Sequence, residues 1–154
     1  MSMRYLTQGE KENSRRLYEC CFPEDSQKFV DYYYQEKCRE NEIAVIEENG
    51  KIISMVHANP FTVSCCGTQA EVHYIVAVAT DPEYRRRGYM RQLMQQVLRD
   101  CRNRGEVFSF LMPADPAYYE PLGYRYWNNQ YVWEIPKRAG IAAKGILPKS
   151  RISI

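Results

Sequence analysis

The chain has 154 residues, enough for one domain with a substantial hydrophobic core. Hydrophobic residues make up 45% and charged residues 26%, which is ordinary for a globular protein. No apolar run approaches the roughly 18 residues of a membrane span, and the first residues lack the apolar stretch of a signal peptide. We therefore expect a cytoplasmic protein without a membrane partner.

The six cysteines and two histidines do not follow a metal-binding pattern. No Cys-x-x-Cys pair occurs, and two histidines are too few for the usual zinc spacings. In the cytoplasm thiols stay reduced, so a disulfide framework is not expected either. The sequence predicts reduced structural thiols and no metal.

Charge divides the chain into a domain and a tail. The net charge is +2, but no acidic residue follows Glu134, and residues 1–135 hold 16 basic and 19 acidic residues. The last segment adds five basic residues together with glycines and prolines. We expect one domain over residues 1–135 and a basic extension or linker over residues 136–154.

The first elements in chain order are a short strand and two helices. Residues 3–6 are typical of a strand, and residues 10–22 of a helix that Pro23 ends. Residues 26–38 place Phe29, Val30 and Tyr33 on one face at helical spacing, which predicts a second helix.

A β-rich region follows. Residues 43–58 contain two strand-like runs around Asn49-Gly50, the strongest short signal for a hairpin turn. Residues 61–66 and 71–80 are two further strand-like runs around a turn at Gly67. The second run contains "IVAVA", which is apolar on both faces and indicates a buried strand.

The clearest helix begins near residue 89. An unbroken apolar stripe joins Tyr89, Met90, Leu93, Met94, Val97, Leu98 and Cys101. Gly105 is a typical helix end. Residues 107–112 then predict a strand, residues 113–124 a short helix or turn, and residues 124–135 two strands around a turn at Asn128-Asn129.

Three adjacent arginines, Arg85 to Arg87, stand before Gly88 at the start of that helix. They repel one another and oppose the helix dipole. The first amides of a helix lack intrahelical acceptors and attract anions, and a glycine lets a ligand approach the backbone. A bound pyrophosphate would offset the repulsion; the alternative is a solvated basic helix start.

The segment "PEYRRRGYM" resembles the acetyl-CoA signature of the GNAT N-acetyltransferases, with Arg85-x-x-Gly88-x-Met90 in place of Arg/Gln-x-x-Gly-x-Gly/Ala. The preceding Val78 to Thr80 and Pro82 resemble that family's strand end. Met90 is bulkier than usual, as in the Eis-like branch. The later "AYYEPLGY" resembles a second element of that branch, Tyr-x-x-Phe/Leu-Gly-Tyr, so the resemblance covers about residues 3–135.

This resemblance implies a fold and an activity. The fold would be the α/β GNAT fold, a mixed, mostly antiparallel twisted sheet flanked by about four helices. The activity would be acetyl transfer from acetyl-CoA to a primary amine, by direct attack of the amine on the thioester. CoA would be the co-substrate, and no metal would take part.

The resemblance also implies site residues. The cofactor-contacting residues would be Val78, Ala79, Thr80, Arg85, Arg86, Arg87, Gly88, Tyr89 and Met90. The strand residues would bind the pantetheine arm through their backbone, and the turn would hold the pyrophosphate. Tyr119 would protonate the leaving thiolate, with Tyr118 as the adjacent alternative.

The general base is less clearly marked. Glu71 and His73 lie on the strand that leads to the arginine turn, where many family members carry a catalytic glutamate. They share one face because strand side chains alternate. Val78 is an odd number of residues from both, so its side chain would point to the opposite face unless a bulge changes the alternation. Either residue is thus a candidate base or an ordinary strand residue.

In the GNAT fold the first two helices flank the acceptor, so residues 10–48 bear on its chemistry. They hold eleven acids and the cluster Tyr32-Tyr33-Tyr34. Acids with aromatics suit a cationic amine, although a solvated acidic helix face explains them equally well. Two other functions compete: a silent CoA-binding regulatory domain, and a nucleic-acid-binding module using the arginine-rich helix. Against the latter, the arginines share no continuous face, so we expect no nucleic acid. Self-association stays open.

Overall fold

The computed structural model describes residues 2–65, 67–129 and 151–153. Contacts divide the chain into two compact units, Met1–Phe110 (unit 1) and Leu111–Ile154 (unit 2). We describe each unit by itself. The boundary expected after residue 135 lies outside the described residues.

Unit 1 carries most of the regular structure. Its helices are α1 (Arg15–Cys21), α2 (Gln27–Gln35) and α3 (Tyr89–Asn103), with short 3-10 helices η1 (Gln8–Ser14), η2 (Lys37–Arg39) and η3 (Pro82–Tyr84). Its strands are β1 (Ser2–Tyr5), β2 (Glu42–Glu48), β3 (Lys51–Cys65), β4 (Thr68–Thr80) and the beginning of β5 (Ser109–Leu111).

The sheet is ordered β1-β2-β3-β4-β5, and the pairs from β1 to β4 are antiparallel. Asn49 and Gly50, between β2 and β3, have φ angles of 52° and 75°. Both values lie in the left-handed region that a tight hairpin turn needs. The predicted hairpin is therefore confirmed, as is the mixed, mostly antiparallel class.

β3 is one long strand, although two runs separated at Asn59-Pro60 were expected. Proline cannot donate to a strand ladder and is confined to edges. The pairing of β2 with β3 ends at Ala58, so Pro60 lies where β3 has β4 on one side only. Pro60 is thus placed on a local edge, and the strand continues through it.

The first expected helix is partly wrong. Residues 8–14 form the 3-10 helix η1, and the α-helix begins only at Arg15. The second expected helix is confirmed but ends three residues earlier, at Gln35. Ser26 caps its start, because its Oγ accepts a hydrogen bond of 3.3 Å from the amide of Phe29.

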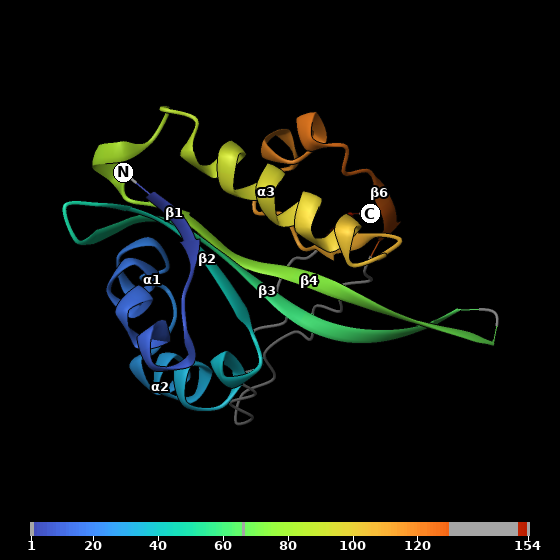
Figure 1. Ribbon diagram of the computed structural model, residues 1–154, viewed down its shortest axis with the longest axis horizontal. Coiled ribbons are helices and arrows are strands. Elements are labelled where there is room, and N and C mark those ends of the chain that lie inside the picture. Colours follow the sequence, from blue (N-terminus) through green and yellow to red (C-terminus); the bar gives the residue numbers. More distant parts are fainter. Residues whose placement is uncertain (1, 66, 130–150, 154) are drawn as a thin grey trace, which may run out of the picture. The chain divides into compact units, whose positions relative to one another are not determined.

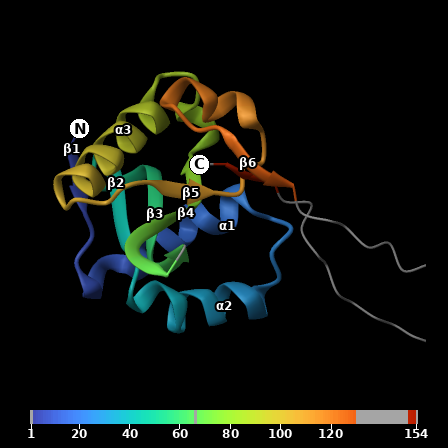
Figure 2. The ribbon, with the colours of Figure 1, turned by 90° about the vertical axis from the view of Figure 1, so that its right-hand side faces the viewer.

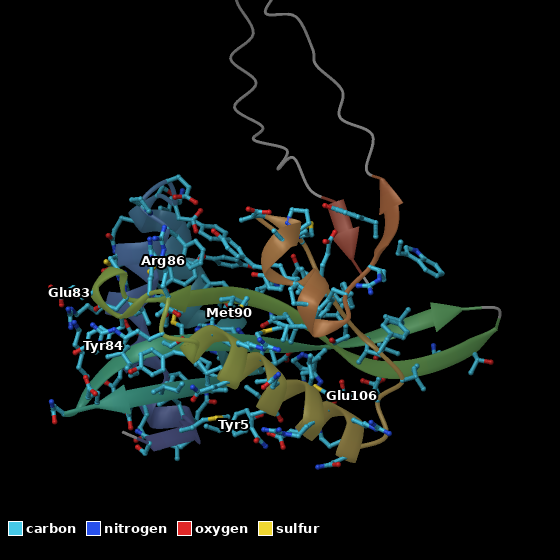
Figure 3. The ribbon with its side chains drawn as sticks, turned by 90° about the horizontal axis from the view of Figure 1, so that it is seen from above. Tyr5, Glu83, Tyr84, Arg86, Met90 and Glu106 are labelled. Atoms are coloured by element: carbon cyan, nitrogen blue, oxygen red, sulfur yellow. The ribbon has the colours of Figure 1, made fainter. Side chains whose placement is uncertain are left out.

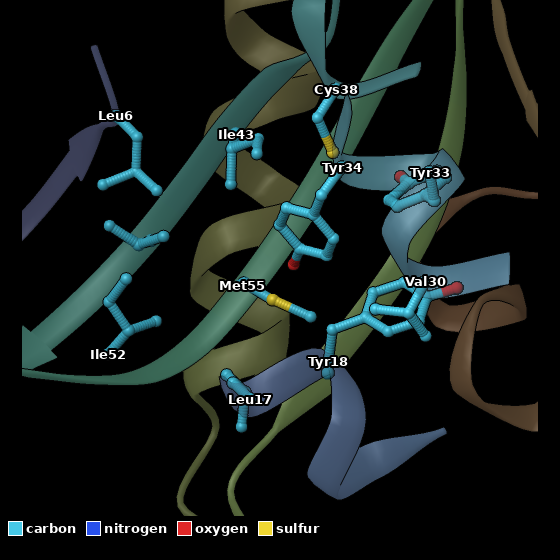
Figure 4. Packing of buried hydrophobic residues seen from close by; sticks show 12 residues of the cluster. Leu6, Leu17, Tyr18, Val30, Tyr33, Tyr34, Cys38, Ile43, Ile52 and Met55 are labelled. Atoms are coloured by element: carbon cyan, nitrogen blue, oxygen red, sulfur yellow. The ribbon is translucent and has the colours of Figure 1, made fainter. Parts of the chain in front are cut away.

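The helices cover opposite faces of the sheet: α1 and α2 lie on one face of β1–β4 and α3 on the other (Figures 1 and 2). Under α1 and α2, a cluster joins aromatic side chains of the helices to aliphatic side chains of β2 and β3 (Figure 4). Its members include Leu17, Tyr18, Tyr34, Ile43 and Met55, all buried. We call this side the α1–α2 face and the other the α3 face.

Unit 2 contains the end of β5, two 3-10 helices, η4 (Pro116–Tyr118) and η5 (Glu120–Leu122), and the strands β6 (Tyr126–Asn129) and β7 (Arg151–Ser153). Leu111 of β5 pairs with Ser153, and β6 pairs with β7, both antiparallel. The expected turn at Asn128-Asn129 is wrong, because both residues belong to β6. Part of the expected linker, Arg151–Ser153, is a strand. Within the described residues, no helix combines the length and apolar character that crossing a membrane requires.

We predict that the apolar stripe of α3 is a main source of stability. Leu93 is fully buried on this helix, whereas Gln95 is exposed. Leu93→Ala should lower the free energy of unfolding by about 2–5 kcal/mol, because it removes buried methyl groups and leaves a cavity. Gln95→Ala should change it by less than about 0.5 kcal/mol. Urea titration monitored by circular dichroism measures both; equal losses would mean that α3 does not pack through this face.

Candidate active site

The strand β4 ends in a turn that is held from several sides. The Asp81 carboxylate accepts a hydrogen bond of 3.1 Å from the amide of Glu83 and pairs with Lys51 Nζ at 2.7 Å. The Asp81 amide donates to the carbonyl of Ile53 at 2.9 Å. The Lys51 ion pair holds the pKa of Asp81 below its usual value, so the carboxylate stays charged. These contacts fix where the next helix begins.

The helix α3 begins at Tyr89 without a side-chain cap. Its N-cap residue is Gly88, with φ 81°, and the described residues supply no side-chain cap to the first amides. A Cβ on Gly88 would meet nothing nearer than Gln92 Nε2 at 4.0 Å, so this glycine is required by its φ angle and not by crowding. The first amides of α3 are therefore left for an external acceptor.

The three arginines of the turn are exposed and none pairs with a carboxylate among the described residues. Arg85 Nε donates to the carbonyl of Thr80 at 3.1 Å, and Arg87 Nη2 to that of Glu83 at 3.0 Å. Arg87 also lies over the Tyr84 ring, 5.2 Å from its centroid. Arg86, labelled in Figure 3, has φ 63° and forms no hydrogen bond or ion pair with the part of the chain that is described.

β4 contains an extra residue just before this turn. The register with β3 shifts between Met55 and His57, so that Ala77 and Val78 stand opposite the single residue Val56. Ala77 has φ 47°, which a residue other than glycine seldom adopts. This is a β-bulge, which leaves one residue outside the regular hydrogen-bond ladder and bends the strand.

The bulge changes which residues of β4 share a face. Residues paired across two strands lie on the same face, and Thr80 pairs with Ser54 while His73 pairs with Pro60. Ser54 and Pro60 have the same parity, so Thr80 and His73 both lie on the α3 face. Without the bulge they would lie on opposite faces.

Glu71 and His73 lie far along the sheet from the arginine turn. Glu71 Oε1 accepts a hydrogen bond of 2.6 Å from Thr62 Oγ1, near the end of the β3–β4 hairpin. His73 Nδ1 lies 2.9 Å from Glu106, just after the C-terminal end of α3. Figure 3 shows Glu106 and Arg86 at opposite ends of this helix. About 15 helical residues, or roughly 22 Å, separate the two ends.

One group of metal-binding residue types surrounds His73. Ligand atoms of His73, Cys101 and Glu106 lie within 4.8 Å of one another. Arg104 donates to Glu106 at 3.0 Å and to the Cys101 sulfur at 3.4 Å. The Arg104 guanidinium thus already binds two of the three candidate ligands. Burial also raises the pKa of Cys101 to about 12, which disfavours the thiolate that would bind a metal. The arrangement is that of an ion-pair network.

Tyr119 belongs to unit 2. It follows η4, is 9% exposed, and packs its ring edge-on against Tyr124 with 6.1 Å between centroids. Burial raises the pKa of Tyr119 to about 12, so the phenol keeps its proton at neutral pH. Tyr118 is 62% exposed. Of the two neighbours, Tyr119 has the side chain held in a defined position.

Seven of the eleven acids of residues 10–48 form ion pairs with described arginines of unit 1. Two arginines bind five of them: Arg15 lies against Glu12, Glu19 and Asp31, and Arg4 against Glu10 and Glu47. Of the tyrosine cluster, Tyr33 and Tyr34 are buried in the core and only Tyr32 is exposed. The paired acids and the two buried tyrosines therefore serve mainly the packing of α1 and α2.

A family model described as the acetyltransferase (GNAT) domain matches residues 2–127. The chain belongs to this family. The resemblance given by the arginine turn is thereby confirmed, together with the fold class. No curated protein matches the sequence significantly.

Solved structures share the fold of this GNAT domain. A probable N-acyltransferase of unknown function from Enterococcus faecalis V583 superposes with TM-score 0.74 at 22% identity, over 82% of this chain and 33% of that one. Eis1 from Mycobacterium abscessus gives 0.66 at 18% identity, over 81% and 32%. A GNAT acetyltransferase from Brucella melitensis in complex with acetyl-CoA gives 0.68 at 19%, over 80% and 82%. The chain therefore spans about a third of the length of the first two.

Two features of the site had no counterpart in the residues singled out from the sequence. One is the bulge at Ala77, for which "IVAVA" gives no signal, since alanine is not a residue that favours positive φ. The other is Asp81, which an Asp-Pro pair before a helix would have indicated, because aspartate caps helices and proline suits their first position.

We predict that position 77 is sensitive to side-chain shape. Ala77→Val should destabilise the protein by about 1–3 kcal/mol, because a β-branched residue fits positive φ poorly. Ala77→Gly should be neutral or stabilising by up to about 1 kcal/mol. Thermal unfolding of the three proteins measures the difference. If valine were tolerated as well as glycine, the strand would be regular here and the bulge absent.

Proposed function

We propose that this GNAT domain transfers the acetyl group of acetyl-CoA to a primary amine. The observation that carries the proposal is the turn between β4 and α3. Three arginines without a carboxylate partner among the described residues lie there, next to uncapped helix amides and a few residues after the bulge at Ala77. The acetyl-CoA complex of the Brucella melitensis relative supports the choice of CoA.

The pyrophosphate of CoA would occupy the arginine turn. Arg86 is the arginine without a partner in the described residues, so it can turn its guanidinium to the ligand without breaking a contact. Arg85 and Arg87 bond backbone carbonyls through one nitrogen each and keep further N–H groups. The amides of Tyr89 and Met90, in the first turn of α3, would add two more donors.

The bulge would hold the reacting carbonyl. Val78 stands beside the residue of β4 that leaves the ladder, and its amide would donate to the thioester oxygen. The amine nitrogen attacks the carbonyl carbon, the oxygen takes negative charge, and the carbon–sulfur bond then breaks. The nitrogen loses one proton, and the departing CoA thiolate takes one up. Val78 and Thr80 would align the pantetheine arm along the strand.

Tyr119 would serve the leaving thiolate. Because its pKa is raised, the phenol is protonated at neutral pH and can donate a hydrogen bond or a proton to sulfur. Glu71 and His73 are bound to Thr62 and Glu106, and both lie toward the other end of α3 from the turn. A general base must reach the amine directly or through a water. We therefore assign neither residue a direct contact with the amine.

The first test is a calorimetric titration of the protein with CoA and with 3′-dephospho-CoA. Arg86→Ala should weaken both ligands about 10- to 100-fold, since one charge-assisted contact is worth roughly 1.5–3 kcal/mol and the two ligands share the pyrophosphate. Arg102→Ala, an exposed arginine in the last turn of α3, is the matched control and should leave the affinity unchanged.

The outcomes distinguish a wrong function from a wrong placement of the pyrophosphate. If folded wild-type protein binds neither ligand, the acetyltransferase proposal fails. If Arg86→Ala binds CoA as tightly as the wild type, the pyrophosphate lies elsewhere. A loss confined to CoA, with dephospho-CoA unaffected, would move Arg86 to the 3′-phosphate.

A second test addresses Tyr119. Tyr119→Phe should lower kcat about 10²- to 10⁴-fold, the usual worth of a general acid, while the affinity for acetyl-CoA stays unchanged. The exposed Tyr118→Phe is the control and should retain activity. Release of free thiol with a panel of primary amines follows the reaction. Equal activity of the two variants would exclude Tyr119 as the acid.

A further inference from the structure

Two buried polar atoms on the α1–α2 face lack partners. They are Nε2 of His57 and Oδ1 of Asn59, on β3, and neither forms a hydrogen bond with any described residue. His57 is 0% exposed. The two residues are two positions apart in a strand, so their side chains lie on the same face. A buried polar group without a partner is costly, and two neighbouring ones point to a ligand or a water.

A hydrogen-bond chain indicates the state of the His57 ring. Asn41 Nδ2 donates to Tyr33 Oη at 3.1 Å, and Tyr33 Oη lies 2.9 Å from His57 Nδ1. Nitrogen is a better acceptor than the neighbouring Cys38 sulfur, so we assign the Tyr33 proton to the bond with Nδ1. The proton of the neutral ring is then on Nε2. Burial, with a contribution from Lys11, lowers the pKa of His57 to about 3, so the ring is neutral at pH 7.

His57 and Asn59 thus carry one donor and one acceptor two positions apart on the same face of β3, both uncharged. A hydroxyl or a carboxamide, each of which donates and accepts, is complementary to this pair. A protonated amine is not, because it has no lone pair to accept a hydrogen bond from Nε2–H and the pair offers no negative charge. The polar group that fits here is therefore neutral.

The pair lies beside the bulge and beside an aromatic surface. His57 pairs with Val76 and Asn59 with Tyr74, so they stand about two and four residues from Val78, or roughly 7 and 13 Å along the strand. The rings of Phe61, Tyr74 and Phe110 pack on one another with centroids 4.9 to 5.8 Å apart. Phe61 is 45% exposed. The β3–β4 hairpin, to which Phe61 and Tyr74 belong, extends beyond the helices (Figure 1).

We propose that His57 and Asn59 form a recognition subsite for the acceptor, which is a primary amine with a ring or apolar body and a hydroxyl or carboxamide about 7–13 Å from the nitrogen. Phe61, Tyr74 and Phe110 contact the apolar body. The inference rests on the proposed function, because the bulge is taken as the place of the thioester. It adds a neutral recognition group to the amine acceptor, whereas the acids of residues 10–48 are largely engaged with arginines.

Nuclear magnetic resonance can test the subsite directly, because the chain has only two histidines. Protein labelled with ¹⁵N-histidine and saturated with CoA is titrated with tyramine and with phenethylamine, which differ by one hydroxyl. His73→Gln assigns the two sets of signals. We expect tyramine to shift the His57 Nε2 resonance and phenethylamine to leave it in place, with His73 unaffected by either amine.

The matched variant is Asn59→Leu, which keeps the size of the side chain and removes the acceptor. Wild-type protein should acetylate tyramine with a kcat/KM about tenfold above that for phenethylamine, the effect of one hydrogen bond. In Asn59→Leu the ratio should fall to about one, with the affinity for CoA unchanged. His57→Phe should give the same ratio, and the Asn59 variant covers the case in which His57→Phe does not fold.

Each outcome bears on the subsite. An Nε2 resonance that responds to neither amine, with the kcat/KM ratio near one in wild-type protein, would mean that the pair holds a buried water only and would overturn the inference. A shift with tyramine but no acetylation of any amine would keep the subsite and overturn the transferase proposal. Absence of CoA binding in the calorimetric titration would overturn the transferase proposal separately.

Discussion

The extra residue in β4 is the constraint on which the rest of unit 1 depends. It forces Ala77 to φ 47° and inverts the faces of the strand beyond it. Ala79 therefore joins the core under α1 and α2, while Thr80 turns to the α3 face, where its Oγ1 lies 2.8 Å from Ser54 Oγ. Only then does the chain leave the sheet in the direction that starts η3 and α3. A regular strand would exchange these two side chains and aim the arginine turn differently.

Charge is distributed unevenly over this framework. Arg4 and Arg15 each bind more than one carboxylate, and Arg104 binds Glu42 and Glu106. The arginines of the turn bind no described carboxylate: Arg85 and Arg87 donate to backbone carbonyls, Arg85 also to the Cys21 sulfur, and Arg86 to no described residue. Three like charges at the positive end of a helix are unfavourable without a counter-ion. Unlike Arg4, Arg15 and Arg104, the arginines of the turn have no described carboxylate beside them, which leaves their charge available to an anionic ligand.

The two faces of the sheet have different chemistry. On the α3 face, His73 is held by Glu106, and Arg104 completes the network, so its polar groups satisfy one another. On the α1–α2 face, His57 is satisfied at one ring nitrogen only, and the neighbouring Asn59 oxygen has no described partner. His73, the histidine that the sequence singled out, is thus the one whose ring is engaged by a partner. The buried His57, next to the bulge, is the histidine whose Nε2 has no described hydrogen-bond partner.

The sequence by itself determined the features that depend on neighbouring residues. These features are the hairpin at Asn49-Gly50, the apolar stripe of α3 and the arginine-glycine turn, which follow from local backbone preferences and the helical period. The arginine-glycine turn with the second tyrosine element was also enough to recognise the family. The tertiary structure alone decided the bulge at Ala77, the passage of β3 through Pro60 and the partners of His57. These depend on register between strands and on what packs across the sheet, which no local pattern encodes. The same reason explains why the alternation of residues along β4 could not by itself place Val78 relative to Glu71 and His73.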